Sequence, residues 1–180
     1  MNYVEAPYPY QLDSKLETSI FLGGGITNCS NWQATLTNEL NHLVVPITVF
    51  NPRRKKFDLS DPKQSDIQIR WEHQFLRLCD VVVFYFSHET VCPITLFELG
   101  AALERNLCRN NPQKIIVYCE HNYVRKMDVG IQVQLINDLY EQPIKFARVH
   151  DVYSHFVSDV IMELTYISST KHIMHNALHF

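Results

Sequence analysis

The 180-residue chain lacks the features that mark membrane, secreted and zinc-binding proteins. No apolar run approaches the roughly 20 residues needed to cross a bilayer, and the first residues lack the basic and apolar regions of a signal peptide. The five cysteines are an odd set without a CxxC pair, which indicates neither a disulfide framework nor a cysteine-rich metal site. We therefore expect a cytoplasmic protein in a reducing compartment, without a membrane partner.

Positive charge is also scarce. The formal net charge is -3, and the 16 Lys and Arg residues are scattered, apart from the run at residues 53–56. Without a broad basic face to follow a phosphate backbone, polymeric nucleic acid is not an expected partner. Hydrophobic residues make up 46% and charged residues 19%, a balance typical of a folded domain with a core. We expect one domain spanning residues 1–180.

Strand-like apolar runs alternate with segments of helical periodicity. Strands are predicted at residues 19–22, 47–50, 81–86, 114–119 and, weakly, 144–147, and helices at 31–43, 67–78, 93–107, 129–139 and 152–167. The start of the chain, to about residue 17, is interpreted as an irregular arm, and residues 53–66 as a long polar loop. The alternation predicts an α/β fold. We expect a doubly wound, mainly parallel sheet of about five strands, flavodoxin- or Rossmann-like, with helices on both faces.

Three of the five glycines are consecutive, Gly23-Gly24-Gly25, and directly follow a predicted strand. Ligands of doubly wound sheets bind outside the carboxyl ends of the strands, so this tract could bring a ligand close to the backbone. A plain tight turn is the alternative. A dinucleotide fingerprint would need a glycine and an acid where Asn28 and Asn51 stand. NAD binding is therefore disfavoured, and no cofactor is expected.

Two further strand ends carry polar residues. At the first, the amide of Asn51, held by Pro52, could donate to a ligand, and Arg53 could hold a phosphate or carboxylate, unless the loop is simply solvated. The other leads to a helix with Glu98 among small and apolar neighbours, where stabilisation of the helix dipole is the alternative explanation. Position alone favours a structural role for Asp80, which precedes the buried strand at 81–86.

Other clusters give weaker signals. His172, His175 and His179 would share one face of a helical tail, but no acid or thiol joins them, so no metal site is expected. Trp71 is interpreted as either a core residue or a stacking platform. Cys92 has no feature that lowers its thiol pKa apart from a possible helix start, and a packed thiol is expected.

Six blocks, in order, resemble the nucleoside 2-deoxyribosyltransferase-like family: SIFLGGGI, VFNPRR, IRWEHQFL, CDVVVFYF, ETVCPITLFELGAAL and KIIVYCE. They cover roughly residues 18–130. The resemblance implies an enzyme that cleaves or transfers the N-glycosidic bond of a nucleoside, deoxynucleoside or nucleotide. It makes Glu98 the nucleophile. It also makes Asp80 the group that assists the departing base by proton transfer, which overrides the interpretation from position.

The chain departs from the family pattern at Cys92, where well-characterised members carry an aspartate and where Glu89 or Thr90 could substitute. Asp128 aligns with an asparagine that some members donate across a subunit interface, so a homo-oligomer is expected. Strand ends and resemblance together give the predicted substrate-binding residues, which are Gly23, Gly24, Asn51, Arg53, Trp71, Glu89, Thr90 and Asp128.

A carboxylate nucleophile divides a glycosidic displacement into two easier steps through a covalent sugar intermediate. A second acid with a raised pKa must protonate the departing base. The expected partner is a small nucleoside or nucleotide, with water or a second base as acceptor. Two alternatives stay open. One is a non-catalytic nucleotide sensor of the same fold, suggested by Cys92, and the other is an enzyme for another ribosyl compound.

Overall fold

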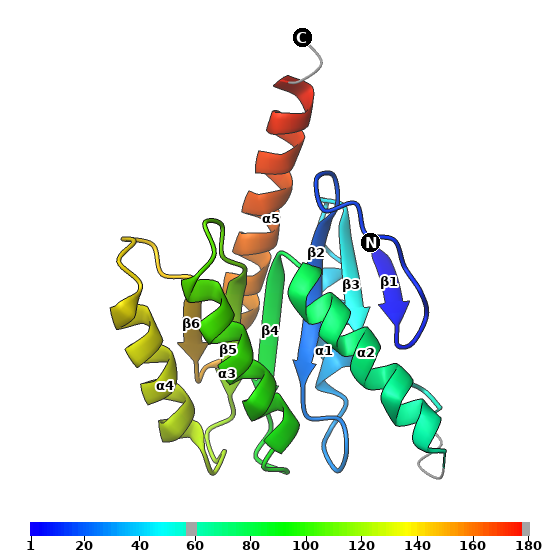
Figure 1. Ribbon diagram of the computed structural model, residues 1–180, viewed down its shortest axis with the longest axis vertical. Coiled ribbons are helices and arrows are strands. Elements are labelled where there is room, and N and C mark those ends of the chain that lie inside the picture. The colour runs from blue at the N-terminus through cyan, green and yellow to red at the C-terminus, as the bar shows by residue number, and fades with distance from the viewer. Residues whose placement is uncertain (57–60, 178–180) are drawn as a thin grey trace.

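A computed structural model describes residues 1–56 and 61–177. Within these ranges five helices surround a six-stranded sheet in which every neighbouring pair is parallel (Figure 1). The strands are β1 (Asn2–Glu5), β2 (Thr18–Gly24), β3 (Ile47–Asn51), β4 (Val81–Phe86), β5 (Lys114–Cys119) and β6 (Ala147–His150). The helices are α1 (Trp32–Leu40), α2 (Pro62–Leu78), α3 (Pro93–Leu107), α4 (Lys126–Leu139) and α5 (Tyr153–Ala177). The predicted doubly wound α/β fold is confirmed.

Both faces of the sheet are covered, so alternate side chains of each strand enter different cores. In β4, Phe84 and Phe86 pack with α2, α3 and α4, whereas Val83 and Tyr85 pack with α1 and α5. Figure 1 shows α2, α3 and α4 in front of the sheet, with α1 and α5 behind it. Because neither face meets water, all six residues of β4 are buried, as the uninterrupted apolar run predicts.

The amino-terminal segment is not wholly irregular, as the sequence suggested. Residues Asn2–Glu5 form the edge strand β1, which pairs in parallel with β3 from Asn2 opposite Thr48 to Glu5 opposite Asn51. An edge strand bonds to a neighbour on one side only and can be very short. The four residues of β1 are therefore too few to show the alternation of apolar and polar side chains that predicts a strand.

Helix ends and the last strand also differ from their predicted positions. Helix α2 begins at Pro62, within the predicted loop, because Asp61 caps it by accepting from the amide of Lys63 at 3.0 Å. Strand β6 begins at Ala147, where the predicted strand ends. Helix α5 continues to Ala177, well past residue 167, and its last turns extend beyond the sheet (Figure 1). None of the described helices is long and apolar enough to span a bilayer.

The winding direction of the chain reverses between β2 and β4. From β2 the chain crosses over α1 to β3 on one side, then returns over α2, on the opposite face, to β4 on the other side. A crevice opens at the carboxyl ends of the strands at such a reversal. The fold therefore predicts a ligand site beside the glycine tract at the end of β2 and the loop after β4.

Candidate active site

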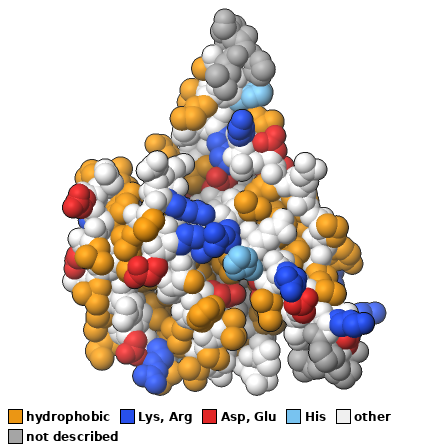
Figure 2. Space-filling view, viewed as in Figure 1, with side chains coloured by type: hydrophobic (Ala, Val, Ile, Leu, Met, Phe, Trp, Pro, Cys, Tyr) orange, Lys and Arg blue, Asp and Glu red, His pale blue; other side chains and the backbone are white. Residues whose placement is uncertain are grey.

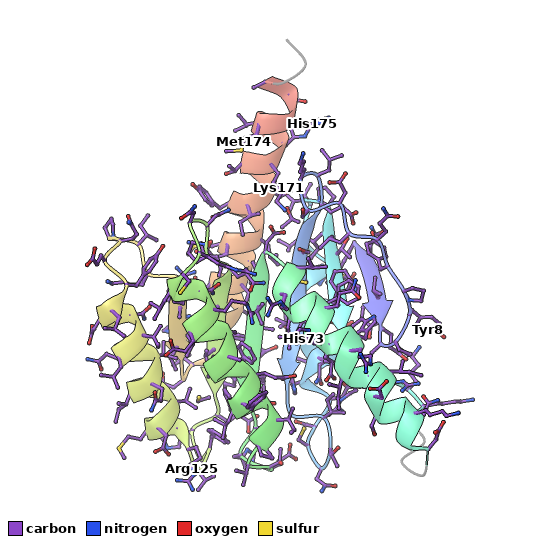
Figure 3. The ribbon with its side chains drawn as sticks, in the orientation of Figure 1. Tyr8, His73, Arg125, Lys171, Met174 and His175 are labelled. Carbon is purple, nitrogen blue, oxygen red and sulfur yellow. The ribbon has the colours of Figure 1, made fainter. Side chains whose placement is uncertain are left out.

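A cavity of about 700 Å³ is lined by α2, α3 and the glycine tract at the end of β2. Its volume lies within the range of small-molecule sites. Figure 2 shows the face of the molecule that carries α2 and α3, and Figure 3 places His73, one of the lining residues, between these two helices. Its polar lining includes Gln68, Glu72 and Arg77 from α2, and Glu98 and Arg105 from α3.

Two glutamates face this cavity from different helices. Glu98 lies in the second turn of α3, and no hydrogen bond to its carboxyl group is found among the described residues. Burial, and to a lesser extent the charge of Glu72 on α2, raise the pKa of Glu98 to about 8. Burial also raises the pKa of Glu72. The pair therefore retains a proton near neutral pH, as a site for acid–base work requires.

Gln68 positions the second carboxyl group. Its side chain is 8% exposed, and its Nε2 donates to Glu72 Oε1 at 2.7 Å and to the carbonyl oxygen of Pro52 at 2.7 Å. The Gln68 Oε1 atom is buried and has no hydrogen-bond partner among the described residues. A buried acceptor without a partner is unfavourable, so this atom is available to a ligand donor.

Sequence reasoning missed both Glu72 and Gln68. Glu72 lies in the quoted block IRWEHQFL, and Gln68 precedes it by one helical turn on the same face of α2. That spacing was the available signal. The family resemblance assigns the proton transfer to Asp80, so this spacing by itself does not identify Glu72 as a site residue.

The structure contradicts the expectation that Asp80 reaches the substrate. Asp80 lies at the amino end of β4, and the six residues of that strand separate it from the carboxyl edge by about 20 Å. Its carboxylate accepts from Lys171 Nζ of α5 at 2.7 and 2.8 Å and from the amide and hydroxyl of Ser19 at 2.9 and 2.8 Å. In Figure 3, Lys171 lies near the top, at the amino ends of the strands, and His73 lies lower. Asp80 joins β2, β4 and α5.

Replacing Asp80 with asparagine should therefore weaken the fold and spare the chemistry. The substitution leaves Lys171 partly buried without its counter-charge, since the two side chains are only 20% and 15% exposed. We expect a loss of about 2–3 kcal/mol in the free energy of unfolding. Urea unfolding of Asp80→Asn, Lys171→Met and the double variant measures the coupling between the two residues. If Asp80→Asn kept its stability and lost turnover, Asp80 would return to the mechanism.

The glycine tract lines the cavity as predicted, but packing within the protein accounts for the absence of side chains. A Cβ atom on Gly24 would lie 2.5 Å from the ring of Trp32 and 2.7 Å from the carbonyl oxygen of Tyr85. A Cβ atom on Gly25 would lie 3.0 Å from Cys92 Sγ. The tract is therefore both a tight turn and a wall of the cavity.

Asn51 and Arg53 do not line the cavity. Asn51 is 4% exposed, and its amide donates to the hydroxyl of Tyr3 at 2.5 Å and accepts from the amide of Arg53 at 2.9 Å. The Arg53 guanidinium donates to the carbonyl oxygens of Ile26, Cys29 and Ser30 at 2.7, 3.1 and 3.1 Å. Both residues fix the loops around the site, so the predicted phosphate contact of Arg53 is not supported.

The other candidates divide between the cavity and the framework. Thr90 lines the cavity. Trp71 is a core residue, 6% exposed, whose Nε1 donates to the carbonyl oxygen of Tyr8 at 2.8 Å. Glu89 links two loops by accepting from the amide of Ser30 at 2.7 Å and from a serine hydroxyl at 3.0 Å. Asp128 lies on α4, largely exposed and 3.6 Å from an arginine, outside the cavity.

Cys92 is a packed thiol. It is 4% exposed at the start of α3, and burial raises its pKa to about 11, which keeps the thiol neutral. The described residues contain no group of three side chains suited to a metal ion. His179, one of the three tail histidines, lies outside the described residues.

Comparisons with known proteins bear on the fold and the family of the chain. A conserved protein from Enterococcus faecalis V583, known from its crystal structure, superposes with a TM-score of 0.53 at 14% sequence identity. The match covers 83% of this chain and 98% of that one, and at this identity it shows the fold alone. No curated protein sequence matches the chain. The family model described as nucleoside 2-deoxyribosyltransferase like matches residues 17–123, which include the glycine tract, Glu72 and Glu98. The chain therefore belongs to the nucleoside 2-deoxyribosyltransferase-like family.

Proposed function

We propose that this protein cleaves or transfers the N-glycosidic bond of a nucleoside or nucleotide, with Glu98 as the nucleophile and Glu72 as the proton donor. One observation carries the proposal. Two carboxyl groups from different helices face a single cavity, and together they retain a proton near neutral pH. Membership of the family supports a reaction of the glycosyl transferase or hydrolase type.

The proposed reaction has two steps. In the form of the pair that carries its single proton on Glu72, the Glu98 carboxylate attacks the anomeric carbon and forms an ester bond. The bond to the base breaks, and its electron pair leaves with the base nitrogen. Glu72 supplies the proton that the base requires. Water or a second base then attacks the same carbon from the vacated side. Glu98 leaves as a carboxylate, Glu72 takes up the proton, and the configuration of the sugar is retained.

The lining of the cavity supports these roles. Ile69 from α2 and Phe97 from α3, which are 63% and 76% exposed, provide apolar surface near the two carboxyl groups. Such surface suits the face of a nucleobase. The free Oε1 atom of Gln68 suits a sugar hydroxyl, which donates a hydrogen bond.

The wild-type protein tests this proposal directly. Purine and pyrimidine ribo- and deoxyribonucleosides and their nucleotides are incubated with it, and base release is followed by chromatography, with and without an added free base. A 2-fluoro-substituted nucleoside should slow the second step, so intact mass should rise by one sugar, located on the peptide that contains Glu98. Tight binding of a ligand that is always recovered unchanged would support the sensor alternative and overturn the proposal.

The pH dependence of base release should be bell-shaped. In acid, both carboxyl groups are protonated and Glu98 is a poor nucleophile. The raised pKa of Glu98, about 8, is the pH at which the pair loses its second proton. Above this pH no proton remains for the departing base. His73, Arg77 and Arg105 are the other basic residues that line the cavity. We expect kcat/KM to fall about tenfold per pH unit on the alkaline side, measured from pH 4 to 10. A flat profile from pH 6 to 10 would contradict a shared proton.

Assembly into a homo-oligomer stays a proposal. The outer surface of α4 carries exposed apolar side chains, which suit a partner surface. They are Met127, Ile131, Leu135 and Leu139. Sedimentation velocity of the wild-type protein would decide the question.

A further inference from the structure

The cavity continues past the two glutamates toward a positively charged end. Both α2 and α3 run antiparallel to the strands, so residues that follow Glu72 and Glu98 lie further from the carboxyl edge of the sheet. Arg105 follows Glu98 by seven residues, or two turns of α3, and both line the cavity. Arg77 follows Glu72 on α2 and lines the cavity as well. At a rise of 1.5 Å per residue, this places the arginines about 7–10 Å along the helices from the carboxyl groups.

The positive charge at this end has no counter-charge. Arg77, Arg105 and Arg109 form no ion pair with any acid in the described part of the chain. Burial, and then repulsion by Arg109 and Arg77, lower the pKa of Arg105 to about 10. Figure 2 shows Lys and Arg side chains gathered beside a histidine in the middle of this face. Three neighbouring guanidinium groups repel one another, and a bound anion would offset that repulsion.

Hydrogen bonds within the protein use only part of this cluster. Arg105 Nη2 donates to the carbonyl oxygen of Leu76 and to Gln113 Oε1, both at 3.2 Å, and Arg109 Nη2 donates to the carbonyl oxygen of Arg77 at 3.1 Å. These bonds satisfy the end of α2, but every acceptor is neutral. The Nε atom of Arg105 is buried and has no partner. The Arg77 side chain forms no hydrogen bond with the described residues. After these bonds are made, the Arg105 Nε donor and the Arg77 side-chain donors have no partner among the described residues, and the charges of the arginines are not neutralised.

We infer that Arg77 and Arg105 form an anion subsite that holds a phosphate group of the substrate while its anomeric carbon lies at Glu98. The inference rests on the proposed function and narrows the substrate class to nucleotides. Guanidinium groups match phosphate oxygens in geometry and charge. Arg53, for which the sequence predicted this role, does not line the cavity, and its guanidinium group donates to three backbone carbonyl oxygens of a neighbouring loop.

Kinetics with paired substrates tests the subsite. For one base, kcat/KM is compared among the nucleoside, its 5′-monophosphate and its 5′-diphosphate. We expect the better phosphorylated substrate to exceed the nucleoside at least about tenfold, and this ratio to fall about tenfold in Arg77→Gln and in Arg105→Gln. Arg105→Lys, which keeps the charge without the planar fork, should lie between. The matched control is Arg70→Gln, on the same helix but 78% exposed and outside the cavity, which should leave the ratio unchanged.

A binding measurement separates failure of the subsite from failure of the proposed chemistry. Inorganic pyrophosphate is titrated by calorimetry into the wild-type protein, Glu98→Gln, Arg77→Gln and Arg105→Lys, at low and high salt. Binding that survives in Glu98→Gln, weakens in both arginine variants and weakens with salt supports the subsite even if no substrate is turned over. The subsite would be overturned if the protein released base from nucleosides and nucleotides equally well, and if Arg77→Gln and Arg105→Lys left the ratio of their kcat/KM values unchanged. The proposed function would remain intact in that case.

Discussion

Replacing Glu98 with glutamine should abolish base release and, at pH 8, make the protein more stable. Glutamine keeps the shape of the side chain but cannot form a glycosyl ester. Loss of the nucleophile should lower kcat by a factor on the order of 10³ or more. Chromatographic base release at saturating substrate measures this change. Unchanged turnover in a folded Glu98→Gln variant would remove Glu98 from the mechanism.

The gain in stability comes from the ionisation of Glu98, which destabilises the folded wild-type protein and which glutamine cannot undergo. The pKa of Glu98 is about 8 in the folded protein and near 4.5 when the chain is unfolded. As pH rises from 4.5 to 8, the unfolded chain loses this proton before the folded protein does, so the wild-type protein loses stability across that interval. Glutamine does not ionise, so the variant should gain about 2 kcal/mol at pH 8, after allowance for partial exposure, and almost nothing at pH 4.5.

Urea unfolding at these two pH values checks the prediction. Glu104→Gln is the matched control, because Glu104 lies on the same helix but is exposed and outside the cavity. It should change neither turnover nor the pH dependence of stability. A Glu98→Gln variant that was less stable at both pH values would point to a structural role for Glu98.

Replacing Glu72 with glutamine should have the second largest effect, and its size should depend on the leaving group. An adenine or hypoxanthine base needs a proton to depart, so its release should slow by a factor of about 10²–10⁴. A cationic pyridinium base such as nicotinamide leaves as a neutral molecule and needs no proton. Its release should therefore slow far less in Glu72→Gln, provided that the wild-type protein accepts it.

The pH profile of the same variant gives an independent measurement. Glutamine at position 72 removes the charge that helps to raise the pKa of Glu98, so the Glu98 carboxylate should form at lower pH. With the pyridinium substrate, which needs no proton, the acid limb of kcat/KM should therefore shift to lower pH in Glu72→Gln than in the wild-type protein. Equal losses for both kinds of leaving group would mean that Glu72 holds the substrate and does not transfer the proton.

Much of the fold could be predicted because its signals are local. The apolar run at residues 81–86 and the helical periods on either side identify a buried strand and its crossovers from neighbouring residues alone. The edge strand at Asn2–Glu5 could not be found this way, because its partner β3 lies more than 40 residues away and its own side chains show no alternation. The part of α5 beyond residue 167 also makes a contact that is distant in the sequence, the ion pair between Lys171 and Asp80.

Of the ten candidate site residues, the structure brings Glu98, Gly23, Gly24 and Thr90 to the cavity. Glu98 was found because its helix, its small neighbours and its sequence block are all local features. Asp80 was misassigned because its role depends on which end of the strand faces the crevice and on what occupies its carboxylate. Asn51 ends β3 and Arg53 follows it, as expected, yet their polar side-chain atoms bond to the edge strand β1 and to a loop of the protein itself.

The sequence by itself determined the alternation of strands and helices, the glycine tract after β2 and Glu98 as a candidate nucleophile, since each follows from residues that are close in the chain. Only the tertiary structure decided which acid accompanies Glu98. Glu72 and Glu98 are 26 positions apart in the sequence. They line one cavity because α2 and α3 pack on the same face of the sheet, on either side of β4 in the chain. Burial in that shared cavity raises both pKa values, and it arises only once the helices have packed.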